Sequence, residues 1–223
     1  MSAAAHIPQP TRIAFIGAPG TGKSTLAGAL VPQIKCLHLD VEFCREAARD
    51  YLLRTGDTES PLEQFIMMSD GIKREDELDV HDYVVCDSAT FLSDVYFSYM
   101  RHRADRLGRD LKLDYAQTEI ARVSRERLHR FHHIFYVPVQ DFGQVKDPSR
   151  IYTEHQELIS RMMRAYLDVN LVDYHVVKGV GVDKRVREVM KVLEARGAFP
   201  AEALAANGGR RRKTPAAVTD PTR

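Results

Sequence analysis

A glycine-rich segment near the N-terminus carries the clearest chemical signal in the sequence. It reads Gly17-Ala18-Pro19-Gly20-Thr21-Gly22-Lys23-Ser24 and matches the pattern G-x-x-x-x-G-K-[ST] at every fixed position. Glycines let main-chain N–H groups surround phosphate oxygens, the lysine reaches the β- and γ-phosphates, and the serine hydroxyl binds Mg²⁺. The sequence therefore predicts ATP and Mg²⁺ as cofactors, bound by the residues from Gly17 to Ser24. Thr25 either contacts a phosphate or lies on the helix surface.

Two aspartates follow apolar runs that are typical of buried strands. Asp87 follows residues 83–86, and Asp40 follows residues 36–39. Because open parallel sheets bind ligands beyond the carboxyl ends of their strands, both aspartates are candidate catalytic residues. Asp87 is predicted to order Mg²⁺ together with Ser24, with a turn or helix cap as the alternative. Asp40 is either the base that accepts a proton from an attacking hydroxyl or the N-cap of the next helix.

Three further charged residues are candidates for contact with substrate. Glu42 and Arg45 lie three residues apart, and they either form a surface ion pair or hold substrate at a helix start. Arg150 lies in the polar loop 140–150, after the fourth predicted strand. We interpret it as a catalytic lid arginine that closes on the transferred phosphoryl group, with Lys146 as a weaker second candidate and a plain surface loop as the alternative.

These candidates must be positioned by alternating strands and helices, which predict an α/β fold of three layers around a mostly parallel, about five-stranded sheet. Within it, residues 11–198 form one domain, between a flexible N-terminus at 1–10 and a flexible basic tail at 199–223. Pro32 closes the first helix, and a capping-box pattern starts another at Ser60. We predict strands at 12–16, 36–39, 83–86, 134–137 and 171–177, and helices at 23–31, 41–54, 60–77, 91–106, 114–131, 151–167 and 182–196.

Composition excludes several classes of protein. The 223 residues carry a net charge of +1, which indicates no polyanionic partner for the body of the chain, and the basic residues gather at 210–213. Three cysteines without a C-x-x-C pair argue against a disulfide framework or a structural zinc site. We find neither an apolar run of membrane-spanning length nor a signal-peptide pattern. The expected location is cytoplasmic, with no membrane partner.

A family resemblance rests on four segments in a fixed order. They are the loop 17–24, the segment Asp40-Val41-Glu42-Phe43-Cys44-Arg45-Glu46, the strand end Cys86-Asp87-Ser88, and Asp147-Pro148-Ser149-Arg150 followed by Glu154. Over residues 11–196 the chain resembles P-loop kinases of the bacterial ribosylnicotinamide kinase type, and more distantly thymidylate kinases. This resemblance implies ATP·Mg²⁺ as donor and a nucleoside- or nucleotide-type acceptor, held by Asp40, Glu42, Arg45 and Asp87.

The sequence thus favours an ATP-dependent kinase that transfers the γ-phosphoryl group to a hydroxyl of a nucleoside or nucleotide. The chain also resembles phage kinases that phosphorylate 5-hydroxymethyluracil within DNA, so DNA is the alternative acceptor. A P-loop ATPase switch is an alternative from another class. The absence of an N-K-x-D pattern argues against a GTPase, and the length after the sheet leaves no room for the helical domain of a hexameric AAA machine. No pattern specifies the oligomeric state.

Overall fold

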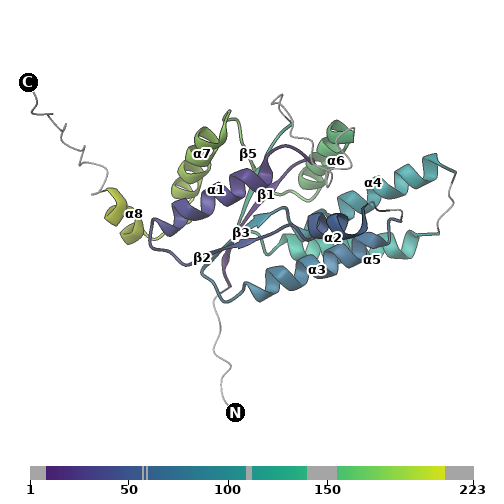
Figure 1. Ribbon diagram of the computed structural model, residues 1–223, viewed down its shortest axis with the longest axis horizontal. Coiled ribbons are helices and arrows are strands. Elements are labelled where there is room, and N and C mark those ends of the chain that lie inside the picture. The colour runs from purple at the N-terminus through teal and green to yellow at the C-terminus, as the bar shows by residue number, and fades with distance from the viewer. Residues whose placement is uncertain (1–8, 57, 59, 109–111, 140–154, 209–223) are drawn as a thin grey trace, which may run out of the picture.

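The computed structural model describes residues 9–56, 58, 60–108, 112–139 and 155–208. Five parallel strands form one sheet in the order β2-β3-β1-β4-β5 (Figure 1). This arrangement confirms the predicted α/β fold class. The strands are β1 (Thr11–Ile16), β2 (Val41–Cys44), β3 (Tyr83–Asp87), β4 (His133–Tyr136) and β5 (His175–Val176).

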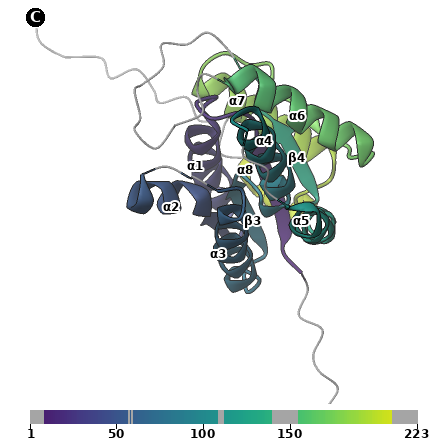
Figure 2. The ribbon, with the colours of Figure 1, turned by 90° about the vertical axis from the view of Figure 1, so that its right-hand side faces the viewer.

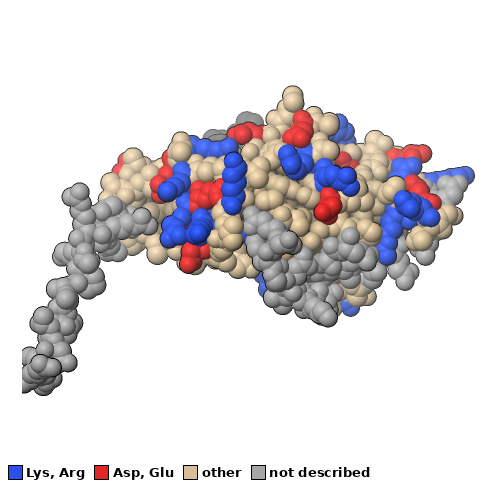
Figure 3. Space-filling view, turned by 90° about the horizontal axis from the view of Figure 1, so that it is seen from above, with Lys and Arg blue, Asp and Glu red and all other residues tan. Residues whose placement is uncertain are grey.

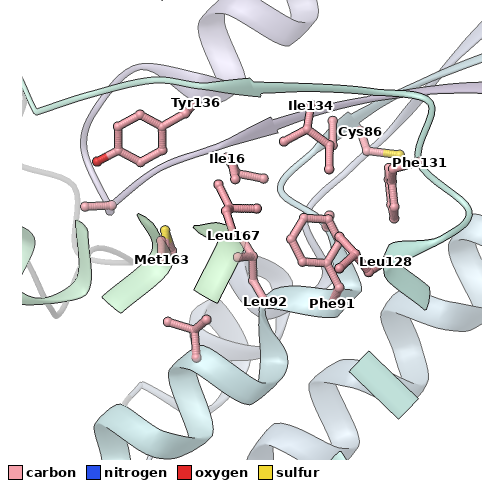
Figure 4. Close-up of a cluster of buried hydrophobic side chains, with 14 of the residues drawn as sticks. Ile16, Cys86, Phe91, Leu92, Leu128, Phe131, Ile134, Tyr136, Met163 and Leu167 are labelled. Atoms are coloured by element: carbon pink, nitrogen blue, oxygen red, sulfur yellow. The ribbon is translucent and has the colours of Figure 1, made fainter. Parts of the chain in front are cut away.

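The strands are apolar on both faces because helices cover both faces of the sheet. Ile13 and Phe15 pack on one side with α1 (Lys23–Lys35) and α7 (Val182–Ala195). Ala14 and Ile16 pack on the other side with α4 (Ser93–Arg106) and α6 (Gln156–Val169). Figure 2 shows α1 and α6 on opposite sides of the strands. In Figure 4, Ile16, Cys86 and Ile134 from the strands face Phe91, Leu128 and Leu167.

The remaining helices between β2 and β4 pack beside α4 and against one another. The short helix η1 (Thr90–Leu92) leads from β3 into α4, and α5 (Asp114–Leu128) contacts both. Two helices, α2 (Ala47–Thr55) and α3 (Glu63–Glu77), pack against each other between β2 and β3 in the chain. The capping box predicted at Ser60 is present, since the Ser60 hydroxyl accepts from Leu62 N–H and Glu63 accepts from Ser60 N–H.

The predicted second strand is wrong by five residues, and the error begins in α1. Helix α1 does not end before Pro32 but continues to Lys35, because Ile34 is fully buried and Cys36 N–H donates to Pro32 O. Residues 36–38 then complete the turn, and His38 has a left-handed φ of 59°. The strand begins only at Val41, so the helix predicted over 41–54 is shortened to α2.

The C-terminal boundary also differs from the prediction. Phe199 is 5% exposed, and its ring lies 5.7 Å from the ring of Tyr83. The Tyr83 hydroxyl donates to Ala198 O at 2.9 Å. Beyond this contact, α8 (Ala201–Gly208) packs Leu204 against the α1 and α7 layer. Residues 199–204 therefore pack against the folded body, which extends past the predicted boundary at 198.

Candidate functional site

The glycine-rich segment forms a tight loop between β1 and α1, as its pattern predicts. Gly20 and Gly22 have φ values of 82° and 86°, in the left-handed region that favours glycine. At Gly17 a Cβ atom would lie 2.3 Å from Val137 O, so no other residue fits there without a shift of the main chain. Glycine is thus required at Gly17 by the close approach of Val137 O, and it is favoured at Gly22 by the left-handed backbone.

The carbonyl groups of this loop are turned toward protein donors. Lys23 Nζ and Thr21 Oγ1 both donate to Ala18 O, at 3.1 and 3.0 Å. Gln156, the first residue of α6, donates to Pro19 O. Lys23 is 7% exposed, so it lies against the loop it belongs to. A bound phosphate chain would compete with Ala18 O for the Lys23 ammonium group.

Helix α1 begins at Lys23, with Gly22 as its N-cap. The first N–H groups of a helix have no intrahelical acceptor, and together with the helix dipole they favour an anion. Ser24 is half-buried and lines the cleft beside Lys23, whereas Thr25 is exposed and outside that lining. Thr25 therefore lies on the surface of α1, and its contact with a phosphate stays a prediction.

A cleft runs from the phosphate loop along the carboxyl edge of β2 and β3. It consists of two adjoining pockets, the first with about 730 Å³ of free space including the part open to solvent. Five residues line both pockets and so join them into one cleft, namely Glu46, Ala48, Gln64, Met67 and Tyr96.

Asp87 lies in the second pocket, at the carboxyl end of β3. The residue is 5% exposed, and its buried Oδ1 makes no hydrogen bond with the described part of the chain. The next residue, Ser88, has a φ of 73°, which is unfavourable for a residue with a side chain. Strained backbone of this kind clusters at functional sites. The predicted position of Asp87 at the ligand edge of the sheet is therefore where the structure places it.

The group of charged residues behind Asp87 fixes the start of η1. The carboxylate of Glu75, which is 2% exposed, accepts from Thr90 N–H at 3.0 Å and from the Thr90 hydroxyl at 2.8 Å. Arg127 donates to the same carboxylate at 2.6 Å. Because Thr90 follows Asp87 by three residues, this buried ion pair restrains the turn that carries Asp87.

Arg45 and Glu46 follow β2 and enter the cleft. Arg45 is exposed and lines the second pocket, as expected for a substrate contact. Glu46 is the N-cap of α2 and lines both the pocket of the phosphate loop and the pocket of Asp87. We did not predict Glu46. Its signal is position, since it is the carboxylate that follows β2 once that strand is placed at Val41–Cys44.

Asp40 and Glu42 are not in this cleft, contrary to the prediction. Asp40 precedes β2 at the amino edge of the sheet, where its carboxylate lies 3.1 Å from His81 Nδ1. Glu42 lies within β2 and faces Lys35, at the end of α1 far from the phosphate loop. Both corrections follow from the displaced strand, because Asp40 comes just before β2 and does not end a strand. The base and substrate-binding roles inferred from Asp40 and Glu42 therefore lose their positional argument.

Arg150 and Lys146 lie outside the described residues, so the proposed lid arginine stays a prediction. No group of three His, Cys, Asp or Glu residues in the described ranges is arranged to hold a metal ion. The residues nevertheless fit Mg²⁺ bound with a nucleotide, since such an ion takes few protein ligands and Asp87 offers a buried carboxylate oxygen that has no other described partner. No helix within the described parts of the chain is long and apolar enough to cross a membrane.

Comparison with known families supports the reading of the loop and sheet. A family model described as an AAA domain, AAA_28, matches residues 12–185. The chain belongs to this AAA-domain family. The matched range contains the phosphate loop, β2 to β5, all of β1 except Thr11, and the whole cleft.

Solved structures show the same fold at low sequence identity. The chain is similar to the NadR protein, solved in complex with NR, with a TM-score of 0.63 and 16% identity. The match covers 86% of this chain and 50% of that one, so the chain spans about half the length of NadR. It is also similar to deoxyadenosine kinase from M. mycoides with bound dATP, with a TM-score of 0.55, 15% identity, and coverage of 82% and 100%. The comparison with curated proteins finds no match.

Proposed function

We propose that the protein is an ATP-dependent kinase that phosphorylates a hydroxyl group of a nucleoside- or nucleotide-type acceptor. One observation carries the proposal: the cleft continues from the phosphate loop past Glu46 to Asp87. A site that only hydrolyses ATP needs room for a water molecule beside the γ-phosphate. This cleft provides a second compartment, which suits an organic acceptor.

The residues along the cleft divide the chemistry between them. Lys23 and the N–H groups at the start of α1 bind and orient the donor phosphates. Glu46 is positioned to accept the proton of the acceptor hydroxyl, the role that the sequence suggested for Asp40. Asp87 and Ser24 are the residues that would hold Mg²⁺, which supplies positive charge to the phosphates when it is bound.

The acceptor class is supported by the neighbours and by the lining of the cleft. The NadR structure contains NR and the other neighbour is a deoxyadenosine kinase, so related folds act on or bind small molecules of this class. In this chain, apolar Met67 and Leu52 lie beside polar Gln64 and Tyr96 in the lining. Such a mixture suits a flat base with polar edges. Arg45 is available at the cleft for an anionic part of the acceptor.

ATP consumption that depends on an added acceptor is the decisive test. We expect ADP formation to rise when a nucleoside or nucleotide from a panel is added, and phosphate from labelled ATP to appear on that compound. The variant Lys23→Ala serves as the inactive control. Acceptor-independent phosphate release at the full rate would contradict the kinase and favour the ATPase switch, which the AAA-domain description of the family also allows.

DNA that contains 5-hydroxymethyluracil belongs in the same panel as the alternative acceptor. The neighbours give that acceptor no support, since neither is described as acting on DNA. On the face shown in Figure 3, the basic and acidic side chains of the described residues are interspersed. If label from ATP appeared on this DNA and on no small molecule of the panel, the acceptor would be DNA and not a free nucleoside or nucleotide.

A further inference from the structure

A buried arginine from the far end of the chain contacts the phosphate loop from behind. Arg185 lies in the first turn of α7, which packs beside α1 (Figure 1), and it is 4% exposed. Its Nη1 donates to Thr21 O at 3.1 Å, and its Nε donates to Gly179 O at 3.0 Å. One guanidinium group thus joins the phosphate loop to the segment that follows β5.

The hydrogen bond to Thr21 determines which way the next N–H group points. No described peptide bond is cis, so the carbonyl of Thr21 and the N–H of Gly22 point in opposite directions across the peptide plane. Gly22 lines the cleft and Arg185 is outside that lining. With Thr21 O held toward Arg185, the Gly22 N–H is aimed toward the cleft, beside the ammonium group of Lys23.

The contact between the guanidinium and the loop is tight. A Cβ atom on Gly22 would lie 3.2 Å from Arg185 Nη1, so a larger residue at position 22 would push the two apart. Burial lowers the pKa of Arg185, and the nearby charge of Glu188 acts in the opposite direction. Both of these hydrogen bonds go to main-chain carbonyl oxygens, Thr21 O and Gly179 O, so the guanidinium group is held by the backbone on either side. A cation in this position also favours the binding of an anion in the loop.

The segment on the other side of Arg185 is itself held firmly. The carboxylate of Glu188 accepts from Lys178 N–H at 3.0 Å and from Gly179 N–H at 2.7 Å, and it contacts His175 Nε2 at 2.8 Å. Burial alone would raise the pKa of Glu188, but these hydrogen bonds lower it overall. Gly179 is therefore fixed through its N–H by Glu188 and through its carbonyl by Arg185, which leaves Arg185 with little freedom to move.

We propose that Arg185 is a positioning residue for the phosphate loop: it holds the Thr21 carbonyl away from the cleft and so directs the Gly22 N–H at the donor phosphates. This inference rests on the proposed function to the extent that the donor is a nucleoside triphosphate. No residue of α7 is in the described lining of the cleft. Through Arg185, this helix would still affect the affinity of the loop for phosphate.

The test compares the binding of ATP with that of AMP, which lacks the β- and γ-phosphates near Lys23. Three variants are measured by calorimetry alongside the unchanged protein: Arg185→Gln, Arg185→Lys, and Arg187→Gln as the matched control. Arg187 is exposed on the same helix, so its change removes the same charge without touching the loop. Thermal midpoints establish that each variant is folded.

We expect Arg185→Gln to weaken ATP binding about tenfold and AMP binding by less than about threefold, because only the longer phosphate chain reaches the misdirected loop. Arg185→Lys should give an intermediate loss, since an ammonium group keeps the charge but lacks the planar geometry that serves two separate carbonyls. Arg187→Gln should bind both nucleotides as the unchanged protein does.

Two results would overturn the inference. ATP affinity within about twofold of the unchanged protein in the Arg185 variants would remove the link to the loop. Equal losses for ATP and AMP would show a general structural role instead. If Arg185→Gln does not fold, the same two criteria apply to Arg185→Lys. Failure of the proposed function has a different signature, because it appears in the unchanged protein itself, as ATP hydrolysis that needs no acceptor or as a lack of ATP binding.

Discussion

The two edges of the sheet carry charged residues in opposite ways. At the amino edge the charges are paired with one another: Arg130 contacts Asp76 and Asp79, and Arg127 contacts Asp76 at 2.8 Å. Arg12, which is fully buried, joins them through Asp79. At the carboxyl edge, Lys23, Glu46 and Asp87 instead line a cleft. Charges paired with each other contribute to stability, whereas charged residues that line a cleft can contact a ligand bound there.

This difference yields a rule for substitutions in this protein. Changes at the carboxyl edge should reduce activity with little effect on the free energy of unfolding. Changes at the amino edge should do the reverse, because breaking a buried pair leaves one charge without its partner.

The largest effect is expected for Lys23→Ala. Removing the ammonium group takes away the charge that acts on the β- and γ-phosphates, so turnover with ATP should fall on the order of 10³-fold. Lys23 is buried against the loop, and its loss also frees Ala18 O, so a small drop in thermal midpoint is expected. The control Lys35→Ala removes an exposed lysine from the opposite end of α1. Near-normal turnover in Lys23→Ala would refute the phosphate-site assignment.

Glu46→Gln tests the general base that we propose for the acceptor hydroxyl. Replacing a general base by its amide should lower kcat by ~10²-fold while the KM for ATP changes little. Asp40→Asn is the matched control, since Asp40 lies at the amino edge beside His81. Turnover of Asp40→Asn should remain that of the unchanged protein. A loss in Asp40→Asn without a loss in Glu46→Gln would restore the base that the sequence first suggested.

Asp87→Asn should act through the metal requirement. Loss of the negative charge is expected to raise the Mg²⁺ concentration for half-maximal activity and to reduce activity ~10–100-fold. Asp82→Asn is the control, because Asp82 is exposed and immediately precedes the strand that carries Asp87. If the Mg²⁺ titration of Asp87→Asn overlays that of the unchanged protein, Asp87 is a turn residue only.

The amino edge supplies a prediction about stability and pH. Burial lowers the pKa of His133, the first residue of β4, from 6.5 to about 4. Protonation therefore favours the unfolded chain, so this contribution is complete near pH 7 and declines as the pH falls from 6.5 toward 4. His133 is only half-buried, so after allowance for solvent screening we expect a loss on the order of 1 kcal/mol.

Urea unfolding at several pH values between 7 and 4 measures this effect. The free energy of unfolding of His133→Asn should fall less steeply over that range than that of the unchanged protein. His129→Asn, which alters an exposed histidine just beyond α5, should leave the slope unchanged. Parallel slopes for the unchanged protein and His133→Asn would show that His133 does not contribute to the acid sensitivity of this edge.

The two edges also differ in how far the sequence predicts them. The phosphate loop is one contiguous pattern with a strand before it and a helix after it, so local information is sufficient. Which residue follows β2 into the cleft depends on where β2 begins. That start is determined by the pairing of β2 with β3 and not by residues 36–39. That pairing places Glu46, not Asp40, at the cleft.

Contacts between distant segments lie further from the reach of sequence patterns. Arg185 and Thr21 are separated by 164 positions, and Arg127 and Glu75 by 52. In the sequence each arginine reads as one more charge on the polar face of a helix. Only the packing of α7 beside α1, and of α5 against η1, converts these charges into buried groups that fix a loop.

The smallest effect is expected from removing residues 209–223, which follow α8 and lie outside the described residues. They contain the basic run 210–213, whereas the preceding chain is slightly acidic. A kinase for a free nucleoside or nucleotide needs no surface that tracks a phosphate backbone, so truncation at Gly208 should leave kcat and KM unchanged. A DNA kinase should lose affinity instead, because each lysine or arginine that neutralises a phosphate adds to the salt dependence of binding. With four basic residues in the run, the slope of log affinity against log salt would change by about three to four.

The measurement is therefore DNA binding by the full chain and the truncated chain across a salt series, together with turnover on the best small acceptor. Equal turnover without salt-dependent DNA binding supports the free acceptor, and a steep slope that disappears on truncation replaces it with DNA.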